Sequence, residues 1–475
     1  MGALMVQGTS SGAGKSLLTT ALCRHFARQG VRVAPFKAQN MSNNARVVEG
    51  GEIGAAQYLQ ALAARVQPDV RMNPVLVKPE SLKSSQVVVR GVPDPTISAL
   101  SWPERAHHLW PVIAESLRSL LDEYELVLLE GAGSPAEINL TDSDVANGRT
   151  ARAADAPVLL VGDIDRGGAF AHLYGTWALV DRELRERIAG FVLNKFRGDQ
   201  SLLSPAPERL NELTGVPVLG VVPWLEHGLP DEDSAASPTT SGNGSKTVAI
   251  VRYPTASNLD EFKVLEQVAL VRWAVRPADL DGVEVVVLPG SKHVSGDLAW
   301  LRRTGLDRAL HARVHAGGRV LGVCGGLQML GEQLCDPDGT DGDERGLDLL
   351  PLRTTFRAEK VTRPTMVRFA TSLEAPWAPL AGRVIHGYEI RQGQTEAIDR
   401  VNEALPAGLG WVRGPVLGIA VHGLLEDPEV LAALLGGVPE RSLDAALDQL
   451  ADAVIAGLQR EKIDRLAGCG HLAKD

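Results

Sequence analysis

Short apolar runs alternate with longer amphipathic stretches over about the first 230 residues of the chain. In stretches such as residues 103–121, apolar side chains recur at the spacing of a helix with one buried face. This alternation predicts right-handed βαβ units and a mainly parallel sheet. The runs expected to form its buried strands are residues 31–36, 126–129, 158–161, 188–193 and 216–222.

A polar interruption separates this region from a second one with the same rhythm. Residues 234–245, SAASPTTSGNGS, are small or polar apart from one proline, so they cannot bury enough apolar surface to order themselves. We therefore expect an interdomain linker here. The runs expected to form strands after it are residues 248–251, 283–288, 319–323 and 416–421.

The end of the chain has a third pattern. Residues 442–458 carry leucine, alanine and valine at helical spacing, and we expect the tail after them to be a cap or a frayed end.

The predicted fold class is α/β, with two doubly wound, mainly parallel sheet domains. The expected divisions are a first domain at residues 1–232, a linker at 233–246, a second domain at 247–440 and a C-terminal helical tail at 441–475.

Composition narrows the class of protein without indicating a function. Of the 475 residues 44% are hydrophobic, and 58 acidic against 48 basic side chains give a net charge of −10. This balance is typical of a globular protein and lacks an overall basic footprint for nucleic acid, although a local basic patch is compatible with an acidic total. The four cysteines form no CxxC pair, no apolar run is long enough to span a membrane, and the first residues lack a secretion signal. We expect a cytoplasmic protein that binds neither nucleic acid nor membrane; its oligomeric state is left open.

A glycine-rich loop follows the first strand-like run and precedes a helix-like one. Its sequence, GTSSGAGKS at residues 8–16, allows backbone N–H groups to face phosphate oxygens, while Lys15 adds charge and the Ser16 hydroxyl suits Mg²⁺. Five residues rather than four separate its first and last glycines, so it is a lengthened Walker A loop. The residues expected to bind the nucleotide here are Gly8, Thr9, Gly12, Gly14, Lys15 and Ser16.

Polar residues end three other predicted strands of the first domain. Glu130 and Asp163 each follow an apolar run, at the edge of the sheet where ligands bind in parallel α/β folds. We expect them to hold Mg²⁺ together with Ser16. Asn194 and Lys195 end a third strand and are placed to contact the purine.

The second domain contains a candidate thiol nucleophile. Cys324 lies between glycines at a predicted strand-to-helix turn, an elbow that exposes the sulfur above the sheet and favours the thiolate. His422 ends another predicted strand and is the expected base. We expect the backbone N–H groups of Gly290, Ser291 and Gly325 to form an oxyanion hole.

These motifs together resemble a known family. GVCGGLQMLG at residues 322–331 is similar to the nucleophile motif of class I, or triad, glutamine amidotransferases, and the first half resembles the dethiobiotin-synthetase type of P-loop fold. The two domains in this order resemble the cobyrinate amidases of cobalamin biosynthesis. The segments that carry the resemblance are MVQGTS at 5–10, PFKAQNM at 35–41, EGAGSPAEINL at 130–140, DIDRGG at 163–168, NKFRGD at 194–199 and GYEI at 387–390.

The resemblance implies a glutamine- and ATP-dependent ligase. Its reaction would be amidation of the b, d, e and g carboxylates of adenosylcobyrinic acid a,c-diamide, with ATP as co-substrate, Mg²⁺ as activator and no tightly bound prosthetic group. ATP would convert a carboxylate into an acyl phosphate, and Cys324 would release ammonia from glutamine. Lys37 is expected to steer the acidic substrate. The KAQNM and EGAGSPAEINL segments favour this reaction over that of the sister group, the cobyrinic acid a,c-diamide synthases.

Two positions depart from the pattern of the family. Class I amidotransferases usually carry Glu two residues after the catalytic His, where this chain has Leu424, and Glu426 is a poor substitute. We therefore expect a dyad of Cys324 and His422. The family tends to carry His after GYEI, whereas this chain has Arg391.

Two hypotheses from other classes stay open at this point. A ParA/MinD-like ATPase switch would share a deviant P-loop, but it would need neither Cys324 nor His422. A pseudo-amidotransferase would keep the second domain only as a scaffold, with an inert Cys324.

Overall fold

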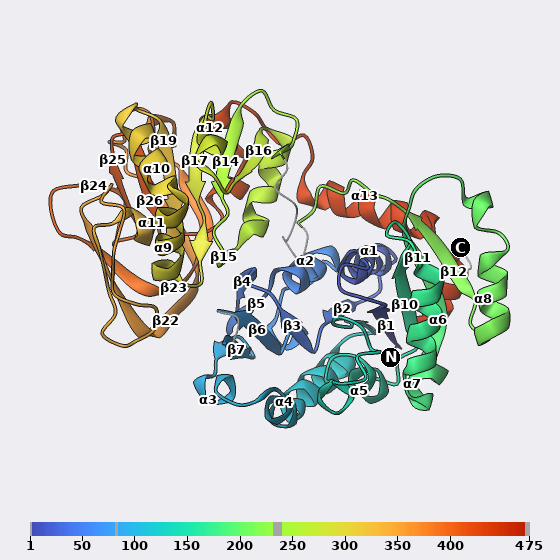
Figure 1. Ribbon diagram of the computed structural model, residues 1–475. Coiled ribbons are helices and arrows are strands. Elements are labelled where there is room, and N and C mark those ends of the chain that lie inside the picture. The colour runs from blue at the N-terminus through green and yellow to red at the C-terminus, as the bar shows by residue number, and fades with distance from the viewer. Residues whose placement is uncertain (1, 81–83, 231–239, 471–475) are drawn as a thin grey trace.

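Two α/β domains lie side by side in the computed structural model, which describes residues 2–80, 84–230 and 240–470 (Figure 1). The first domain is drawn in blue and green, and most of the second is drawn in yellow and orange. A red helix close to the end of the chain runs back to the first domain. The predicted fold class, α/β with two sheet domains, is confirmed.

A six-stranded sheet forms the centre of the first domain. All of its strand pairs are parallel. The five apolar runs predicted as strands all form strands of this sheet, and the sixth strand is the N-terminal one. In spatial order the strands are β12 (Val218–Pro223), β11 (Ile188–Phe196), β10 (Val158–Asp163), β1 (Gly2–Gly8), β9 (Leu126–Glu130) and β2 (Val33–Phe36).

Alternate side chains of these strands enter two separate apolar layers. Leu126 and Leu128 of β9 pack in one layer, whereas Val127 and Leu129 pack in the other. Successive strand residues point to opposite faces of a sheet. A continuous apolar run therefore makes both faces apolar, and helices can pack on each of them. The helices of this domain are α1 (Lys15–Arg28), α2 (Ala55–Ala63), α3 (Pro95–Ser98), α4 (Trp102–Glu123), α5 (Gly148–Ala153), α6 (Ala169–Leu179), α7 (Arg182–Arg187) and α8 (Ala206–Thr214), with short 3-10 turns η1 (Val70–Met72), η2 (Thr141–Ser143) and η3 (Gln200–Leu203).

Smaller strands, which the apolar pattern did not reveal, lie between the main sheet and the second domain. The strands of a four-stranded sheet are β3 (Gln39–Met41), β6 (Val75–Pro79), β7 (Ser85–Val89) and β8 (Val92–Pro93). Beside it, β4 (Ala45–Val48) and β5 (Gly51–Gly54) form an antiparallel hairpin. The apolar runs of these strands are at most three residues long, as at residues 75–77 of β6, so they are shorter than the runs that identified the main sheet.

The sheet of the second domain is parallel in its middle and antiparallel at both edges. Its strands, in spatial order, are β13 (Thr240–Ser241), β16 (Leu270–Ala274), β14 (Thr247–Val251), β17 (Val285–Leu288), β19 (Arg319–Val323), β26 (Val416–Ile419), β25 (Gly410–Arg413) and β24 (Asn402–Leu405). The helical elements around it are α9 (Val294–Thr304), α10 (Leu306–His315), α11 (Gly325–Leu330), α12 (Pro428–Leu435), η4 (Leu259–Gln267), η5 (Pro277–Leu280), η6 (Ala378–Leu380) and η7 (Leu424–Glu426).

A long antiparallel hairpin of the second domain faces the first domain. It consists of β22 (Leu352–Arg368) and β23 (Val384–Ala397), which pair along most of their length. The remaining strands are β15 (Ala256–Ser257) with β18 (Gly290–Ser291), and β20 (Gln333–Cys335) with β21 (Glu344–Arg345).

The expected linker falls partly outside the described residues, which exclude 231–239. Its last part is structured, because β13 pairs antiparallel with β16 and so extends the second sheet. The linker proposed at residues 233–246 therefore ends in an edge strand of the second domain.

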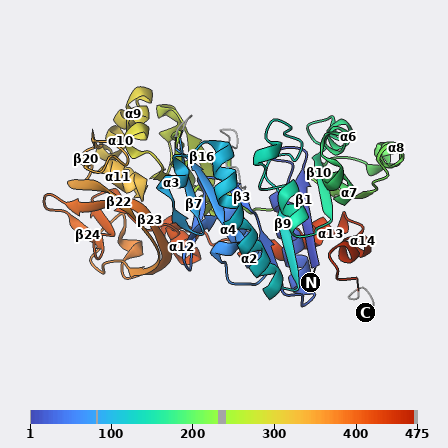
Figure 2. The same ribbon diagram turned by 90° about the horizontal axis from the view of Figure 1, so that it is seen from below.

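The C-terminal helices belong to the core of the first domain. α13 (Leu443–Ala456) and α14 (Arg460–Leu466) place Leu450 and Ile463 in the same apolar layer as Leu22 of α1. Figure 2 shows α14 beside the strands of the first domain, far from α9 and α11. The tail after residue 458 was expected to be a cap or a frayed end, but as far as residue 470 it packs as part of this core.

Candidate functional site

The glycine-rich loop connects β1 to α1 as the sequence predicts. Gly8 ends the strand, Thr9 N donates to Val161 O at 2.9 Å, and Lys15 begins the helix. Lys15 Nζ donates to Ser10 O and to Gly133 O, each at 3.0 Å. The lysine therefore joins the loop to the turn that follows β9.

Gly14 occupies a position that only glycine can fill. Its φ is +99°, and a Cβ there would lie 1.9 Å from Asn194 Nδ2. Asn194 Nδ2 donates to Ala13 O at 2.9 Å, and Lys195 Nζ donates to Gly12 O at 2.6 Å. Both side chains thus brace the loop from the end of β11, and their contact with the purine stays a prediction.

Glu130 is the polar centre of the nucleotide site. It is fully buried at the end of β9, and its Oε1 accepts from Ser16 Oγ at 2.7 Å and from Lys37 Nζ at 2.9 Å. Gln60 Nε2, from α2, donates to Oε2 at 2.5 Å. A hydroxyl and a carboxylate oxygen side by side are hard donors of the kind that Mg²⁺ prefers. Ser16 and Glu130 therefore fit a magnesium ion.

Two further residues of the predicted nucleotide site, Lys37 and Asp163, lie near the same edge of the sheet and contact charged side chains. Lys37 is 3% exposed, so it is not a solvated surface lysine. Asp163 ends β10 and pairs with Lys195 Nζ at 3.0 Å and with Arg166 Nε at 3.6 Å. A cation of the protein thus faces both carboxylates, Lys195 at Asp163 and Lys37 at Glu130, and the expected role of each acid as a metal ligand stays a prediction.

Cys324 occupies the sharp turn that the sequence predicts between β19 and α11. Its φ of 52° and ψ of −105° lie outside the ordinary regions for a residue with a side chain. The following helix begins at Gly325, and the Cys324 Sγ lies 3.4 Å from Ile390 O of β23. A strained turn of this kind presents the nucleophile above the sheet in α/β hydrolytic enzymes.

The structure brings His422 to Cys324 and supplies a third residue that was not expected. His422 lies beside Cys324, where its charge lowers the pKa of the thiol, and its Nδ1 lies 2.8 Å from Glu261 Oε1. The backbone N–H of Gly423 donates to Glu261 Oε2 at 2.7 Å. The expected dyad is therefore wrong in this respect, since the three side chains form a Cys–His–Glu arrangement.

Glu261 escaped sequence reasoning because it lies far from the position that the family pattern indicates. It belongs to η4 and lies 161 residues before His422. Glu426, the poor substitute, faces Arg46 at 2.8 Å and does not serve His422. An acidic residue at the start of a short helical turn is common, so no local signal distinguishes Glu261 from a helix-terminal carboxylate.

The charges of this arrangement favour a thiolate beside an imidazolium. Burial by itself opposes both charges, but Glu261 and Cys324 outweigh it and raise the pKa of His422 to about 10. In the same way, burial would raise the pKa of Cys324, yet His422, Arg391 and the Gly325 N–H together lower it. Arg391, at the position where the family tends to carry His, thus contributes positive charge toward the sulfur.

The predicted oxyanion-hole residues lie around the same point. A Cβ on Gly325 would lie 2.6 Å from Ser291 N, and a Cβ on Gly290 would lie 3.1 Å from His422 Cε1. The backbone N–H of Gly325 is also one of the groups that lower the pKa of Cys324. Ser291 and Gly325 are thus neighbours beside the cysteine, and their oxyanion role stays a prediction.

Charged side chains are buried where the two domains meet. Glu52 of β5 is fully buried and accepts from Lys78 Nζ at 2.5 Å and from Lys360 of β22. Lys292, next to the oxyanion loop, reaches Gln86 of β7 at 3.3 Å. Burial and the charge of Lys360 lower the pKa of Lys292 to about 8.

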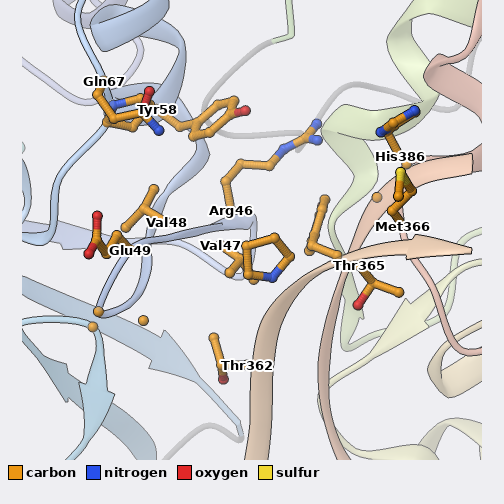
Figure 3. A pocket seen from close by; sticks show the side chains of 18 of the residues that line it. Arg46, Val47, Val48, Glu49, Tyr58, Gln67, Thr362, Thr365, Met366 and His386 are labelled. Atoms are coloured by element: carbon orange, nitrogen blue, oxygen red, sulfur yellow. The ribbon is translucent and has the colours of Figure 1, made fainter.

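A cavity of about 1140 Å³ opens beside these contacts (Figure 3). The β4–β5 hairpin and α2 line one side, and β22 and β23 line the other. Arg46, Tyr58 and His386 border it, with Arg46 and Tyr58 contributed by the first domain. The cavity is therefore an interdomain feature and not part of either sheet edge.

Comparison with known families assigns a class to each domain. The model of the CobQ/CobB/MinD/ParA nucleotide-binding domain matches residues 4–232, and that of the CobB/CobQ-like glutamine amidotransferase domain matches residues 247–430. Each match covers the site described for that domain. The chain therefore joins a nucleotide-binding domain to a glutamine amidotransferase domain.

Similar curated proteins cover both domains. The chain is 56% identical to a cobyric acid synthase of Variovorax paradoxus over 94% of this chain and 96% of that protein. It is 54% identical to one from Polaromonas, over 94% and 95%, and 54% identical to one from Acidovorax, over 98% and 97%. The chain belongs to the cobyric acid synthase family.

These findings decide between a ligase and an ATPase switch. The first family description also covers MinD and ParA, so the nucleotide-binding domain alone is compatible with an ATPase switch. The second domain and the identity along the whole chain confirm a glutamine amidotransferase ligase of the cobyrinate amidase type. Among the described residues, no helix combines the length and the apolar character that crossing a membrane requires.

Proposed function

We propose that the chain catalyses the glutamine- and ATP-dependent amidation of the b, d, e and g carboxylates of adenosylcobyrinic acid a,c-diamide. The observation that carries the proposal is the pairing of a Cys–His–Glu arrangement with a phosphate-binding loop in one chain of this family. Four free cysteines among the described residues fit a reducing compartment, so we place the reaction in the cytoplasm.

The first domain would activate the acid. A carboxylate is a poor electrophile, so it must first become an acyl phosphate by transfer of the terminal phosphoryl group of ATP. Lys15 and the backbone N–H groups of the loop would stabilise charge on the phosphates, and Lys37 would steer the substrate carboxylate. Ser16 and Glu130 would hold Mg²⁺, which neutralises phosphate charge when bound, and Asp163 is the further candidate ligand.

The second domain would supply ammonia. The Cys324 thiolate attacks the amide carbon of glutamine, and the amides of Ser291 and Gly325 receive the negative charge that develops on oxygen. His422 gives a proton to the departing ammonia while Glu261 stabilises the imidazolium. Water then hydrolyses the thioester and releases glutamate.

The packing of the domains fits transfer of ammonia between the two sites. Free ammonia would become protonated in solution and lose its nucleophilicity, so the sites must communicate within the protein. The buried ion pair of Glu52 with Lys360 joins the domains, as does the contact of Lys292 with Gln86. Docked domains, rather than independent ones, therefore support the proposal.

The variant Cys324→Ala separates the two chemistries. With glutamine, ATP, Mg²⁺ and adenosylcobyrinic acid a,c-diamide, we expect it to give no amidated product. With a high concentration of free ammonia in place of glutamine, we expect amidation to continue, because the activation site is intact. Mass spectrometry of the corrinoid measures both, since each step replaces an OH group by NH₂.

Three results, from this assay and two companion assays, would favour the alternatives. A folded Cys324→Ala protein that loses amidation with both nitrogen sources would contradict two separate sites. Cobyrinic acid accepted in place of its a,c-diamide would indicate the sister reaction. A glutamine-analogue alkylator that fails to label Cys324 in the unmodified enzyme would support the pseudo-amidotransferase.

A further inference from the structure

The first domain contacts the segment that carries Glu261. Leu259 N donates to Asn44 Oδ1 at 3.0 Å, and Asn258 Nδ2 donates to Ala45 O at 3.1 Å. Asn258 itself has a positive φ of 55°, in the left-handed region that asparagine adopts more readily than most residues with a side chain. The start of η4 is therefore fixed by residues of the other domain.

Arg46 extends this contact with charge. It is 8% exposed, and its Nε donates to Asp260 Oδ2 at 2.8 Å. Its Nη1 donates to Glu426 Oε2 at 2.8 Å, and its guanidinium lies 5.3 Å from the centre of the Tyr388 ring. Figure 3 shows Arg46 at the cavity, pointing from the first domain toward the side of the second.

Two of these three partners of Arg46, Asp260 and Tyr388, adjoin the glutaminase site. Asp260 directly precedes Glu261, which holds His422. The Tyr388 ring stacks on the His422 ring, with centres 5.2 Å apart and planes at 13°. Arg46 thus acts on the histidine through two routes, by way of the η4 backbone and by way of an aromatic ring.

The Asp260 carboxylate depends on Arg46. Asp260 is 5% exposed, and its Oδ1 has no hydrogen-bond partner among the described residues. Removing the cation would leave a buried carboxylate unpaired, which proteins avoid by moving the group toward water. Because Asp260 and Glu261 are neighbours in one turn, such a movement would displace the group that orients His422.

We propose that Arg46 of the nucleotide-binding domain is a positioning residue of the glutaminase. It holds the Asp260–Glu261 turn and the Tyr388 ring, so the triad is complete only when the two domains are docked. This inference rests on the proposed function for its setting, and it concerns how one domain completes the active site of the other.

The test compares Arg46→Met and Arg46→Lys with the unmodified full-length enzyme. Glutamate release is measured with ATP, Mg²⁺ and the corrin substrate present. We expect kcat for glutamine to fall about tenfold or more in Arg46→Met, since a misplacement of about 1 Å can cost about 100-fold. Arg46→Lys keeps the charge without the fork of donors and should recover part of the rate. The KM for glutamine should change little, because Arg46 does not touch Cys324.

Arg71→Met is the matched control. It also removes an arginine of the first domain that pairs with two carboxylates, but these are Asp69 and Glu123 of the same domain and do not adjoin the glutaminase site. We expect its glutaminase kcat to match that of the unmodified enzyme. The double variant Arg46→Met with Asp260→Asn should be no slower than Arg46→Met alone, because the two side chains act through one contact.

Three results would overturn the proposal. These are an unchanged kcat in Arg46→Met, an equal loss in Arg71→Met, or an additive loss in the double variant. The ratio of glutamine-dependent to ammonia-dependent amidation should fall in Arg46→Met by the same factor as kcat. If the unmodified enzyme hydrolyses glutamine but does not amidate the corrin, the proposed function fails while the role of Arg46 is still measured.

Discussion

The two active sites of this chain are built in opposite ways, although both lie at the edge of a parallel sheet. At the nucleotide site, the loop of residues 8–16 is expected to supply most of the phosphate contacts, and Glu130 and Asn194 contact it from strands of the same domain. At the glutaminase site, Cys324 is oriented by His422 and Glu261 from distant segments, and the first domain fixes the last of them. A phosphate cradle is thus a local structure, whereas the triad depends on tertiary and interdomain packing.

The difference has a physical cause. Phosphate is bound largely by backbone N–H groups, so one glycine-rich loop at the start of a helix provides most of the required geometry. A proton-transfer chain needs three side chains in line, each held at hydrogen-bond distance. The second requirement makes the glutaminase more sensitive to changes outside its own motif, and each of the following variants tests that contrast.

The largest effect is expected for Glu261→Gln. The amide keeps the size of the side chain but loses the charge that stabilises the His422 imidazolium, so glutaminase kcat should fall by about 100-fold or more. The pKa of His422, raised to about 10 with Glu261 present, should fall when Glu261 is removed. Activity that requires the imidazolium disappears as pH rises through this pKa, so the basic limb of the pH–rate profile should move to lower pH.

Glu429→Gln is the control for that experiment. Glu429 is also acidic and belongs to the same region, but it is exposed and pairs with Arg383 instead of His422. Its basic limb should coincide with that of the unmodified enzyme. A profile for Glu261→Gln that keeps the original basic limb would show that Glu261 does not serve His422.

A smaller effect, on stability, is expected for Glu52→Gln at the interface that joins the two sites. The variant leaves Lys78 and Lys360 buried without their anion, which should lower the free energy of unfolding by about 3–5 kcal/mol. Burial would raise the pKa of Glu52, but these lysines lower it to about 2. Because the folded-state pKa lies below the ordinary value of 4.5, the contribution of Glu52 is complete above that pH and disappears as pH falls toward 2.

The midpoints of denaturant unfolding of Glu52→Gln and of the unmodified enzyme, measured at neutral and at acidic pH, check this expectation. Glu186→Gln is a suitable control, since it changes an exposed acid paired with Arg182. That variant should unfold with an unchanged midpoint. Equal midpoints for Glu52→Gln and the unmodified enzyme at neutral pH would mean that the buried cluster does not stabilise the docked domains.

Much of the fold could be predicted because buried parallel strands are continuous apolar runs. The run at residues 126–129 identified β9, and the helical spacing at 103–121 lies inside α4. The β4–β5 hairpin could not be predicted in this way, because its polar residues are buried by contact with the other domain. The placement of α13 on α1 was equally hidden, since helical spacing shows that one face is buried but not against which partner.

The residues of the candidate sites also fall into two groups, those that a sequence motif indicates and those that only the folded chain brings into place. Lys15, Ser16 and Cys324 lie within motifs whose spacing reflects local geometry, so sequence could indicate them. Glu261 has no motif, because the requirement on it is only to reach His422 in space. Arg46 is even harder to recognise from the sequence. Its proposed role arises from docking between the domains, so it leaves no pattern near the motifs of either site.

The smallest effect is expected for Asp163→Asn, judged beside Glu130→Gln. Glu130 contacts Ser16 at 2.7 Å, and neutralising it should reduce ATP-dependent amidation by about 100-fold. Asp163 already pairs with Lys195, so its neutralisation should mainly loosen that lysine and raise the KM for ATP a few-fold. Titrating Mg²⁺ at saturating ATP distinguishes a metal ligand from a loop brace, because only loss of a ligand raises the Mg²⁺ requirement. If both variants raise the Mg²⁺ requirement equally above that of the unmodified enzyme, Asp163 is a ligand in its own right. The metal of the nucleotide site would then be held by residues from two strands.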